Sequence, residues 1–186
     1  ENDGAVVIYD KFDAWQVDPS GKVAPFRLTH GREFQHVYRI LRVDPDQENV
    51  GGQMYASVLD EKTLASGIYR LDLSQKRPTG TRLIWGDKRF GVSAFAKSGD
   101  KVAITRQDFT EFPDVWLADK SLQNPVKVSN ANPQQKDYNW GTAEIYKWKA
   151  FTGKMEEGVL YKPENFDPTK KYPLLLYFYE THSNTL

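Results

Sequence analysis

The chain contains no cysteine, which excludes a disulfide-stapled scaffold and any cysteine-ligated zinc site. It also carries no net charge, because 25 Lys and Arg residues balance 25 Asp and Glu residues. Without a basic surface field, nothing in the composition favours a nucleic-acid partner. The longest apolar run is about ten residues, too short to cross a membrane as a helix. We therefore expect no nucleic-acid partner and no membrane span in this chain.

Aromatic residues are plentiful, at 13% of the chain, and favour β-sheet. Four of them fall in the apolar run 170–179, Lys-Lys-Tyr-Pro-Leu-Leu-Leu-Tyr-Phe-Tyr. The run has no period-2 alternation, so both faces require burial, as in a central strand of a parallel sheet. Pro173 fits only at the mouth of such a strand. We expect this run to begin a domain whose other strands and helices lie outside the 186 residues.

Three segments upstream repeat one pattern, an aromatic residue three positions before an Asp. The aromatics are Trp15, Tyr69 and Trp116, which are 54 and 47 residues apart. β-rich runs flank each segment, and a further leading strand precedes the second and third. Four strands per unit at this period are typical of β-propeller blades. The pattern predicts a mainly β fold with two to three four-stranded blades, the first of them without its leading strand. An ordinary antiparallel meander is the alternative.

The composition changes near the polar stretch 130–137, which reads as a linker. Beyond it, 144–150 and 158–162 are β-rich and are separated by a turn at 152–154, so we expect a hairpin. Pro163 ends the hairpin, and a loop leads to the apolar run.

This order of parts resembles the prolyl oligopeptidase family of serine peptidases, and most closely its dipeptidyl peptidase IV-like branch. The resemblance rests on Phe-Asp-Pro-x-Lys-Lys-Tyr-Pro-Leu-Leu-Leu, from Phe166 to Leu176, and on the repeats before it. It implies that 1–136 are the C-terminal blades of a propeller. It further implies that 137–186 are the hairpin and first central strand of a truncated α/β-hydrolase domain.

The resemblance implies a parent enzyme that hydrolyses short peptides with a Ser-Asp-His triad, without a cofactor and in the periplasm or outside the cell. Its nucleophile belongs in Gly-x-Ser-x-Gly, which this chain lacks. Ser93 comes nearest but sits on a predicted strand without the second Gly. His30, His36 and His182 have no recognisable Ser and Asp partners. We expect the chain to be a fragment without activity of its own. A non-catalytic, propeller-like module that binds peptide or protein is the alternative.

One catalytic residue is implied by the resemblance. The family branch has an oxyanion-hole tyrosine just after the apolar strand, and Tyr179 takes that position here. The alternative is that Tyr179 merely ends an aromatic-rich strand. The residues that follow, Glu180-Thr181-His182, depart from the small residues and proline usual in the family. A carboxylate there would oppose a developing oxyanion.

Three other stretches have a candidate role. The stretch 44–49 resembles a calcium loop but lacks its Gly and ligand spacing, so a solvated turn is preferred. Glu156 and Glu157 fall on the hairpin and are read as a solvated strand end. The loop 107–113 either faces a central cavity and touches peptide or packs its aromatics between blades. Open sheet edges and the uncovered apolar run favour self-association of the isolated chain.

Overall fold

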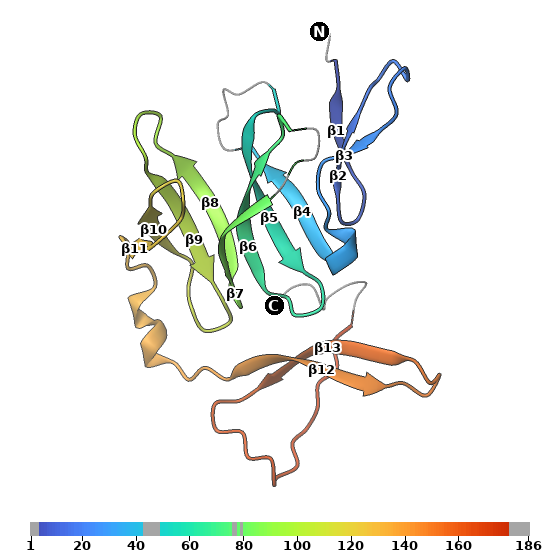
Figure 1. Ribbon diagram of the computed structural model, residues 1–186. Helices are drawn as coiled ribbons and strands as arrows, with labels where there is room; N and C mark the ends of the chain where they lie inside the picture. The colour runs from blue at the N-terminus through green and yellow to red at the C-terminus, as the bar shows by residue number, and fades with distance from the viewer. Residues whose placement is uncertain (1–3, 43–48, 76–77, 79, 179–186) are drawn as a thin grey trace.

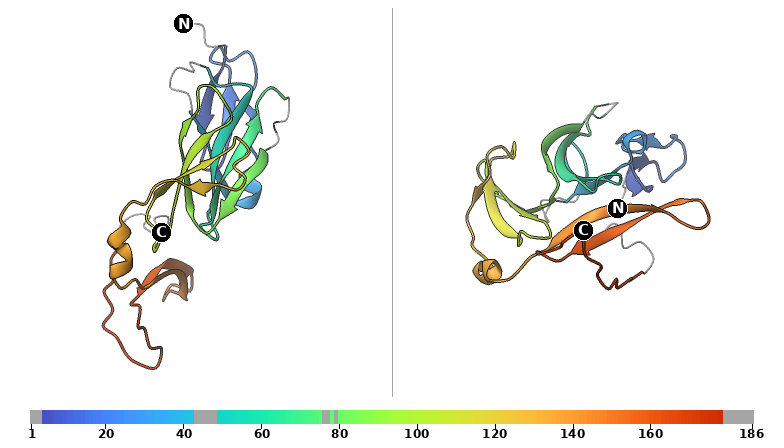
Figure 2. Two further views of the ribbon diagram at one scale, coloured as in Figure 1. Left: turned by 90° about the vertical axis from the view of Figure 1, so that its left-hand side faces the viewer. Right: turned by 90° about the horizontal axis from the view of Figure 1, so that it is seen from below.

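Figure 1 shows a computed structural model of the chain, which describes residues 4–42, 49–75, 78 and 80–178. The fold is mainly β, with four small antiparallel sheets. Three of them stand side by side, and a two-stranded hairpin lies beneath their lower ends (Figures 1 and 2). Within the described residues the three sheets do not close a ring.

The first three sheets follow the three predicted units, with three, four and four strands. Each is a meander in which neighbouring strands along the chain pair with one another. The first contains β1 (Val6–Tyr9), β2 (Ala14–Val17) and β3 (Phe26–Arg27). The second contains β4 (His36–Leu41), β5 (Gln53–Asp60), β6 (Ser66–Asp72) and β7 (Gly80–Gly86). The third contains β8 (Arg89–Phe95), β9 (Val102–Gln107), β10 (Asp114–Ala118) and β11 (Val126–Lys127).

The repeated Asp makes the same turn in all three sheets. In each case its carboxylate accepts the main-chain N–H of a Ser two residues later, at 2.8 Å for Asp18, 3.1 Å for Asp72 and 2.8 Å for Asp119. The Ser hydroxyl donates to the same carboxylate. This Asx-type turn ends the next-to-last strand of each meander and leads into the last one. The repeated motif therefore contains a Ser two residues after the Asp, in addition to the aromatic residue three positions before it.

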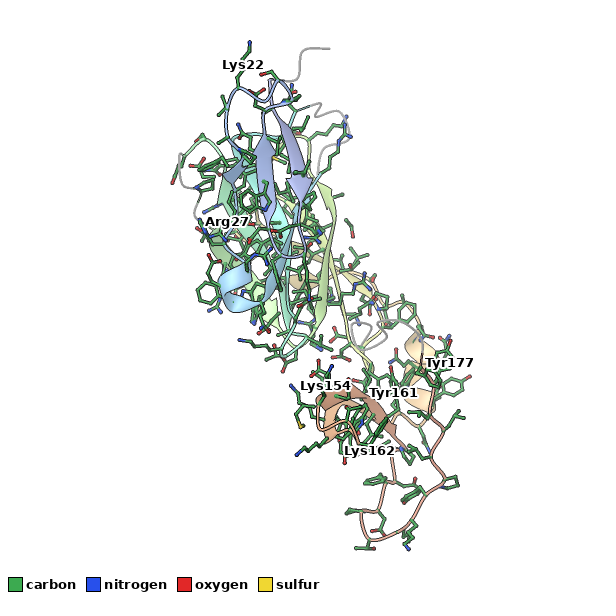
Figure 3. All side chains as sticks on the ribbon, turned by 90° about the vertical axis from the view of Figure 1, so that its right-hand side faces the viewer. Lys22, Arg27, Lys154, Tyr161, Lys162 and Tyr177 are labelled. Carbon is green, nitrogen blue, oxygen red and sulfur yellow. The ribbon has the colours of Figure 1, made fainter. Side chains whose placement is uncertain are left out.

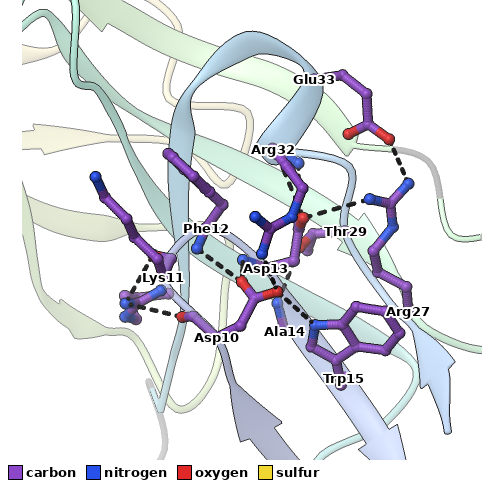
Figure 4. Close-up of polar contacts among 12 residues, drawn as sticks. Asp10, Lys11, Phe12, Asp13, Ala14, Trp15, Arg27, Thr29, Arg32 and Glu33 are labelled. Atoms are coloured by element: carbon purple, nitrogen blue, oxygen red, sulfur yellow. Dashed lines mark hydrogen bonds and ion pairs between the residues drawn. The ribbon is translucent and has the colours of Figure 1, made fainter.

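A second repeated Asp lies two residues before the aromatic and is buried. Asp13 accepts the Thr29 hydroxyl at 2.7 Å and the Gly31 N–H at 2.5 Å (Figure 4). The Thr29 hydroxyl oxygen in turn accepts the Ala14 N–H at 3.0 Å. The Arg27 guanidinium lies 3.6 Å from the carboxylate. This clamp fastens the chain after β3 to the start of β2.

Asp114 repeats the clamp in the third sheet. It accepts the Ser129 hydroxyl at 2.5 Å and the Ala131 N–H at 2.8 Å, and the Val115 N–H donates to Ser129 at 2.8 Å. The ion pair with Lys127, together with these hydrogen bonds, lowers the pKa of Asp114 to about 2. The two clamps match partner for partner, so the first and third sheets fasten their returning chain in the same way.

Gly67 takes the corresponding place in the second sheet. A Cβ there would lie 2.2 Å from the Ile84 carbonyl oxygen and 2.7 Å from the Trp85 ring. The close approach of β7 to β6 therefore requires glycine at the position where the other sheets carry Asp13 and Asp114.

The main core lies between the second and third sheets. Seven buried side chains form it: Tyr55, Ile68, Leu83, Val102, Ile104, Ala118 and Leu122. Two hydrogen bonds link the second and third sheets at the edges of this core. The Tyr55 hydroxyl donates to the Lys120 carbonyl at 2.9 Å, and the Gln123 amide donates to the Leu83 carbonyl at 3.0 Å. The two four-stranded sheets thus form one packed unit.

The linker and hairpin follow the third sheet. The short 3₁₀ helix η2 (Pro133–Asp137) spans the predicted domain boundary, and another, η1 (Arg32–Phe34), joins the first two sheets. The predicted hairpin is present as β12 (Thr142–Lys149) and β13 (Met155–Lys162), with eight residue pairs in register. Among the described residues no helix is long and apolar enough to span a membrane.

The apolar run after the hairpin does not form the predicted strand. Its described part, 170–178, has no helix or strand. The side chains from Leu174 to Phe178 are each at least 71% exposed. A lone segment cannot form a ladder, and no strand in the described part of the chain pairs with it. The expected central strand is therefore absent from this structure.

Candidate functional site

A cleft of about 840 Å³ is lined by residues of the second sheet, the third sheet and the hairpin. Side chains of Val37, Leu59, Phe90 and Phe109 give it apolar walls, and residues 141–145 of β12 also line it. Polar and charged side chains, among them Arg39, Lys88 and Glu144, line the rest of it, and its volume falls within the range of ligand-binding clefts. Because its walls come from three different sheets, their relative placement determines its shape.

An aromatic contact joins the third sheet to the hairpin. Phe109, in the loop between β9 and β10, packs on Trp140 with ring centroids 5.7 Å apart and on Tyr161 at 5.3 Å. Gln135 strengthens this contact, since its side chain donates to the Thr110 carbonyl at 2.5 Å and its carbonyl accepts the Trp140 indole N–H at 3.0 Å. We call these five residues the latch. It fastens the end of β13 that carries Tyr161 to the third sheet.

Figure 3 shows where the hairpin side chains lie relative to the sheets. Tyr161 and Lys162 project from β13 below the sheets, and Tyr177 lies on the tail that follows the hairpin. Lys22 and Arg27 lie far away, on the first sheet. The cleft and the latch are thus confined to the lower end of the molecule.

A charged network holds the loop that carries Phe109. The Lys88 ammonium pairs with Asp108 and lies 2.6 Å from Glu111, and the Arg106 side chain donates to Glu111 at 2.7 Å. Burial raises the pKa of Asp108, but hydrogen bonds from Lys88 and from the N–H groups of Thr110 and Glu111 outweigh it, so the pKa falls to about 2. The loop is therefore fixed by charges that remain ionised at neutral pH.

The same arginine covers a tryptophan whose indole has no hydrogen-bond acceptor. The Arg106 guanidinium stacks 3.7 Å from the centroid of Trp116. The Trp116 indole nitrogen is buried and has no partner among the described residues. In the first sheet the corresponding Trp15 donates to Asp10 at 3.1 Å (Figure 4). The third sheet has a longer β9–β10 loop, and Asp108 pairs with Lys88 instead of reaching the indole.

The predicted site residues do not come together in a catalytic arrangement. Tyr179, the predicted oxyanion-hole donor, lies outside the described residues, as do Glu180-Thr181-His182. Ser93 is exposed on β8, at an irregularity in its pairing with β9. The Nε2 atom of His36 lies 3.8 Å from a carboxylate oxygen of Asp60, at the end of β5. The Nδ1 atom of His30 lies 2.7 Å from the Arg27 guanidinium. The structure therefore adds no support for Ser93 as a nucleophile.

The remaining candidates lie as follows. Glu156 and Glu157 are exposed on β13, and Glu157 pairs with Lys147 at 3.1 Å across the hairpin. This arrangement agrees with a solvated strand end. The calcium-like stretch 44–49 lies outside the described residues except for Asn49. Among the residues described, no group of three or more His, Cys, Asp or Glu side chains could hold a metal ion.

Sequence reasoning located part of the cleft. It singled out the loop 107–113 as a wall of a cavity or as packing between sheets. The structure gives the loop a third role, since Phe109 packs on the hairpin while also lining the cleft. The role of Lys88 was not predicted, because a lysine in a tight turn is ordinarily exposed to solvent. Its two acidic partners, twenty and twenty-three residues later, carry no local signal.

Comparisons with known proteins give a likeness to solved structures and none to a known sequence family. No known family and no curated protein sequence matches the chain. The chain is similar to the isopeptidase AtxE2, solved as a variant with Astexin3-dC4 bound, with a TM-score of 0.57 and 12% sequence identity. The likeness covers 92% of this chain and 25% of AtxE2, so the chain spans about a quarter of that protein's length. At this identity the likeness shows the fold alone.

Proposed function

We propose that the chain is part of a serine peptidase of the prolyl oligopeptidase family, in its dipeptidyl peptidase IV-like branch. In this proposal the first three sheets are the last blades of a propeller. The hairpin begins the α/β-hydrolase domain, and the nucleophile lies outside the 186 residues. The parent enzyme hydrolyses short peptides that enter the cleft between the two parts.

The observation that carries the proposal is the order of parts around the cleft. Three meanders with a shared Asp-x-Ser turn are followed by a linker, a hairpin below the sheets, and the family-like segment Phe166–Leu176. The cleft lies at the junction, where a propeller would limit access to a catalytic domain. The likeness of the fold to a quarter of an isopeptidase agrees with a partial match of this kind.

The exposed tail fits the same proposal. The segment Leu174–Leu176 would be apolar on both faces of a strand, yet its three side chains are exposed to solvent. In a complete hydrolase domain, neighbouring strands would pair with this segment and helices would cover it. Tyr179 would then stand at the end of that strand, as an oxyanion-hole donor worth about 3 kcal/mol of transition-state stabilisation.

The test is a hydrolysis assay on the full-length gene product with chromogenic dipeptides that carry proline or alanine before the scissile bond. We expect cleavage that a serine-directed phosphonofluoridate abolishes, and a loss of kcat on the order of 100-fold in Tyr179→Phe with little change in KM. Full-length protein that binds such peptides without hydrolysing them would instead support the non-catalytic binding module.

A further inference from the structure

The charges that line the cleft are not fully paired. Lys88 and Asp108 neutralise each other within the network described above, and Glu144 pairs with Lys162. Arg39 and Arg89 also line the cleft. Neither has a carboxylate partner in the part of the chain that the structure describes. Asp87 is the one lining carboxylate in that part without an ion pair.

Arg39 is held in place by main-chain oxygens. Its guanidinium donates to the Tyr38 carbonyl at 2.7 Å and to the Lys11 carbonyl at 3.1 Å, and it stacks 5.0 Å from the Tyr9 ring. These contacts fix the group but leave its charge uncompensated. It therefore adds a positive potential to the cleft, and its remaining hydrogen-bonding capacity is small.

Arg89 differs because its side chain is free. It begins β8, directly after the turn that carries Lys88, and is exposed at the cleft wall. It makes none of the hydrogen bonds or ion pairs found among the described residues. A guanidinium fork of this kind binds a carboxylate through two parallel hydrogen bonds. Phe90 and Phe109 line the same cleft and offer apolar surface beside it.

We propose that Arg89 binds a carboxylate of an extended peptide in this cleft, and that Arg39 adds positive charge that favours the same ligand. The inference rests on the proposed function for the choice of a peptide, and it adds a preference for acidic peptides. The carboxylate comes either from the peptide C-terminus or from an Asp or Glu side chain. Asp87 opposes the ligand and sets a limit on its affinity.

The experiment measures binding, so that it does not depend on catalysis. Full-length protein is first treated with a phosphonofluoridate to prevent peptide consumption. Four fluorescent hexapeptides are then titrated by anisotropy. They are identical except for Glu or Gln at the fourth position and a free or amidated C-terminus, so the two sources of the carboxylate are separated. Each variant is checked by its melting temperature before titration.

We expect at least one carboxylate-bearing peptide to bind about tenfold more tightly than the fully neutral peptide. Arg89→Gln should reduce this preference to within about twofold, Arg89→Lys should retain part of it, and Asp87→Asn should increase it. Arg82→Gln, a matched change of an exposed arginine on β7 outside the cleft lining, should leave it unchanged.

Equal affinities for all four peptides would overturn the inference, as would an equal loss in Arg82→Gln and Arg89→Gln. The proposed function is judged separately. A carboxylate preference without any hydrolysis would keep this inference and reject the peptidase. Hydrolysis without a carboxylate preference would do the reverse.

Discussion

Single buried carboxylates hold the repeat together at the residue scale. Asp13 and Asp114 bind the same kinds of partner, a hydroxyl and a main-chain N–H from the chain that follows the last strand of their sheet. Both are almost completely buried. A buried carboxylate is stable only when its acceptor sites are filled, so each clamp specifies where the outer chain must return.

Removing the Asp13 clamp should therefore be costly. We expect Asp13→Ala to lower the free energy of unfolding by about 3 kcal/mol, because it leaves the buried hydroxyl of Thr29 and the Gly31 N–H without their acceptor. Urea unfolding followed by tryptophan fluorescence measures the change. Asp18→Ala, in an exposed turn of the same sheet, is the control and should cost clearly less. Equal losses in the two variants would show that burial of the clamp does not matter.

Ionisation of Asp108 makes the stability of the folded protein depend on pH in the acid range. Its pKa in the folded protein is about 2, below the ordinary value of 3.8. A lowered pKa means that the ionised group stabilises the folded state above pH 3.8, and that this stabilisation disappears as the pH falls towards 2. We expect Asp108→Asn to flatten the fall in stability over this range, measured by urea unfolding at several pH values. An unchanged slope, equal to that of the exposed control Asp137→Asn, would contradict the assigned pKa.

The hairpin is attached at the element scale through one loop. Phe109 reaches from the third sheet to Trp140 and Tyr161, whereas the nearby Phe112 is 42% exposed. Aromatic pairs of this geometry contribute about 0.5–1.5 kcal/mol each beyond the area they bury. The latch therefore contributes a modest, local attachment of the hairpin to the third sheet.

Phe109→Ala should release the hairpin without unfolding the sheets. We expect hydrogen exchange at the main-chain amides of β12 and β13 to speed up by about tenfold, and exchange in β5 and β6 to stay unchanged. Phe112→Ala is the matched control, with no effect expected in either region. Faster exchange throughout the molecule would mean that Phe109 belongs to the core and not to a latch.

The strands were more predictable than their contacts. The alternation of β-rich runs and turn residues predicted the eleven strands of the three sheets, and it also predicted the hairpin. These signals are local, so a single sequence contains them. The prediction of a strand in the apolar run was wrong over its described part, 170–178, since the pattern requires neighbours that the described residues do not supply. The latch and the network around Lys88 depend on pairs far apart in sequence, which single-sequence patterns do not contain.

At the scale of the whole molecule, the exposed apolar tail is the feature most relevant to association between chains. Leu174 to Phe178 presents five large apolar side chains to solvent, and the sheets of the described residues have open edges. Such surfaces drive association between chains. We expect the 186-residue chain to self-associate, and Leu175→Asp to shift it towards monomer in light scattering coupled to size-exclusion chromatography. Thr152→Asp, at the exposed hairpin turn, should not. A wild-type chain that stays monomeric at high concentration would contradict this expectation.

The proposed peptidase is tested most directly by labelling its nucleophile. Full-length gene product is treated with a fluorophosphonate probe, digested, and mapped by mass spectrometry. We predict a single labelled serine within Gly-x-Ser-x-Gly, outside the 186 residues described by this sequence, with Ser93 unlabelled. Absence of any labelled serine in folded, full-length protein, or a label on Ser93, would contradict the account.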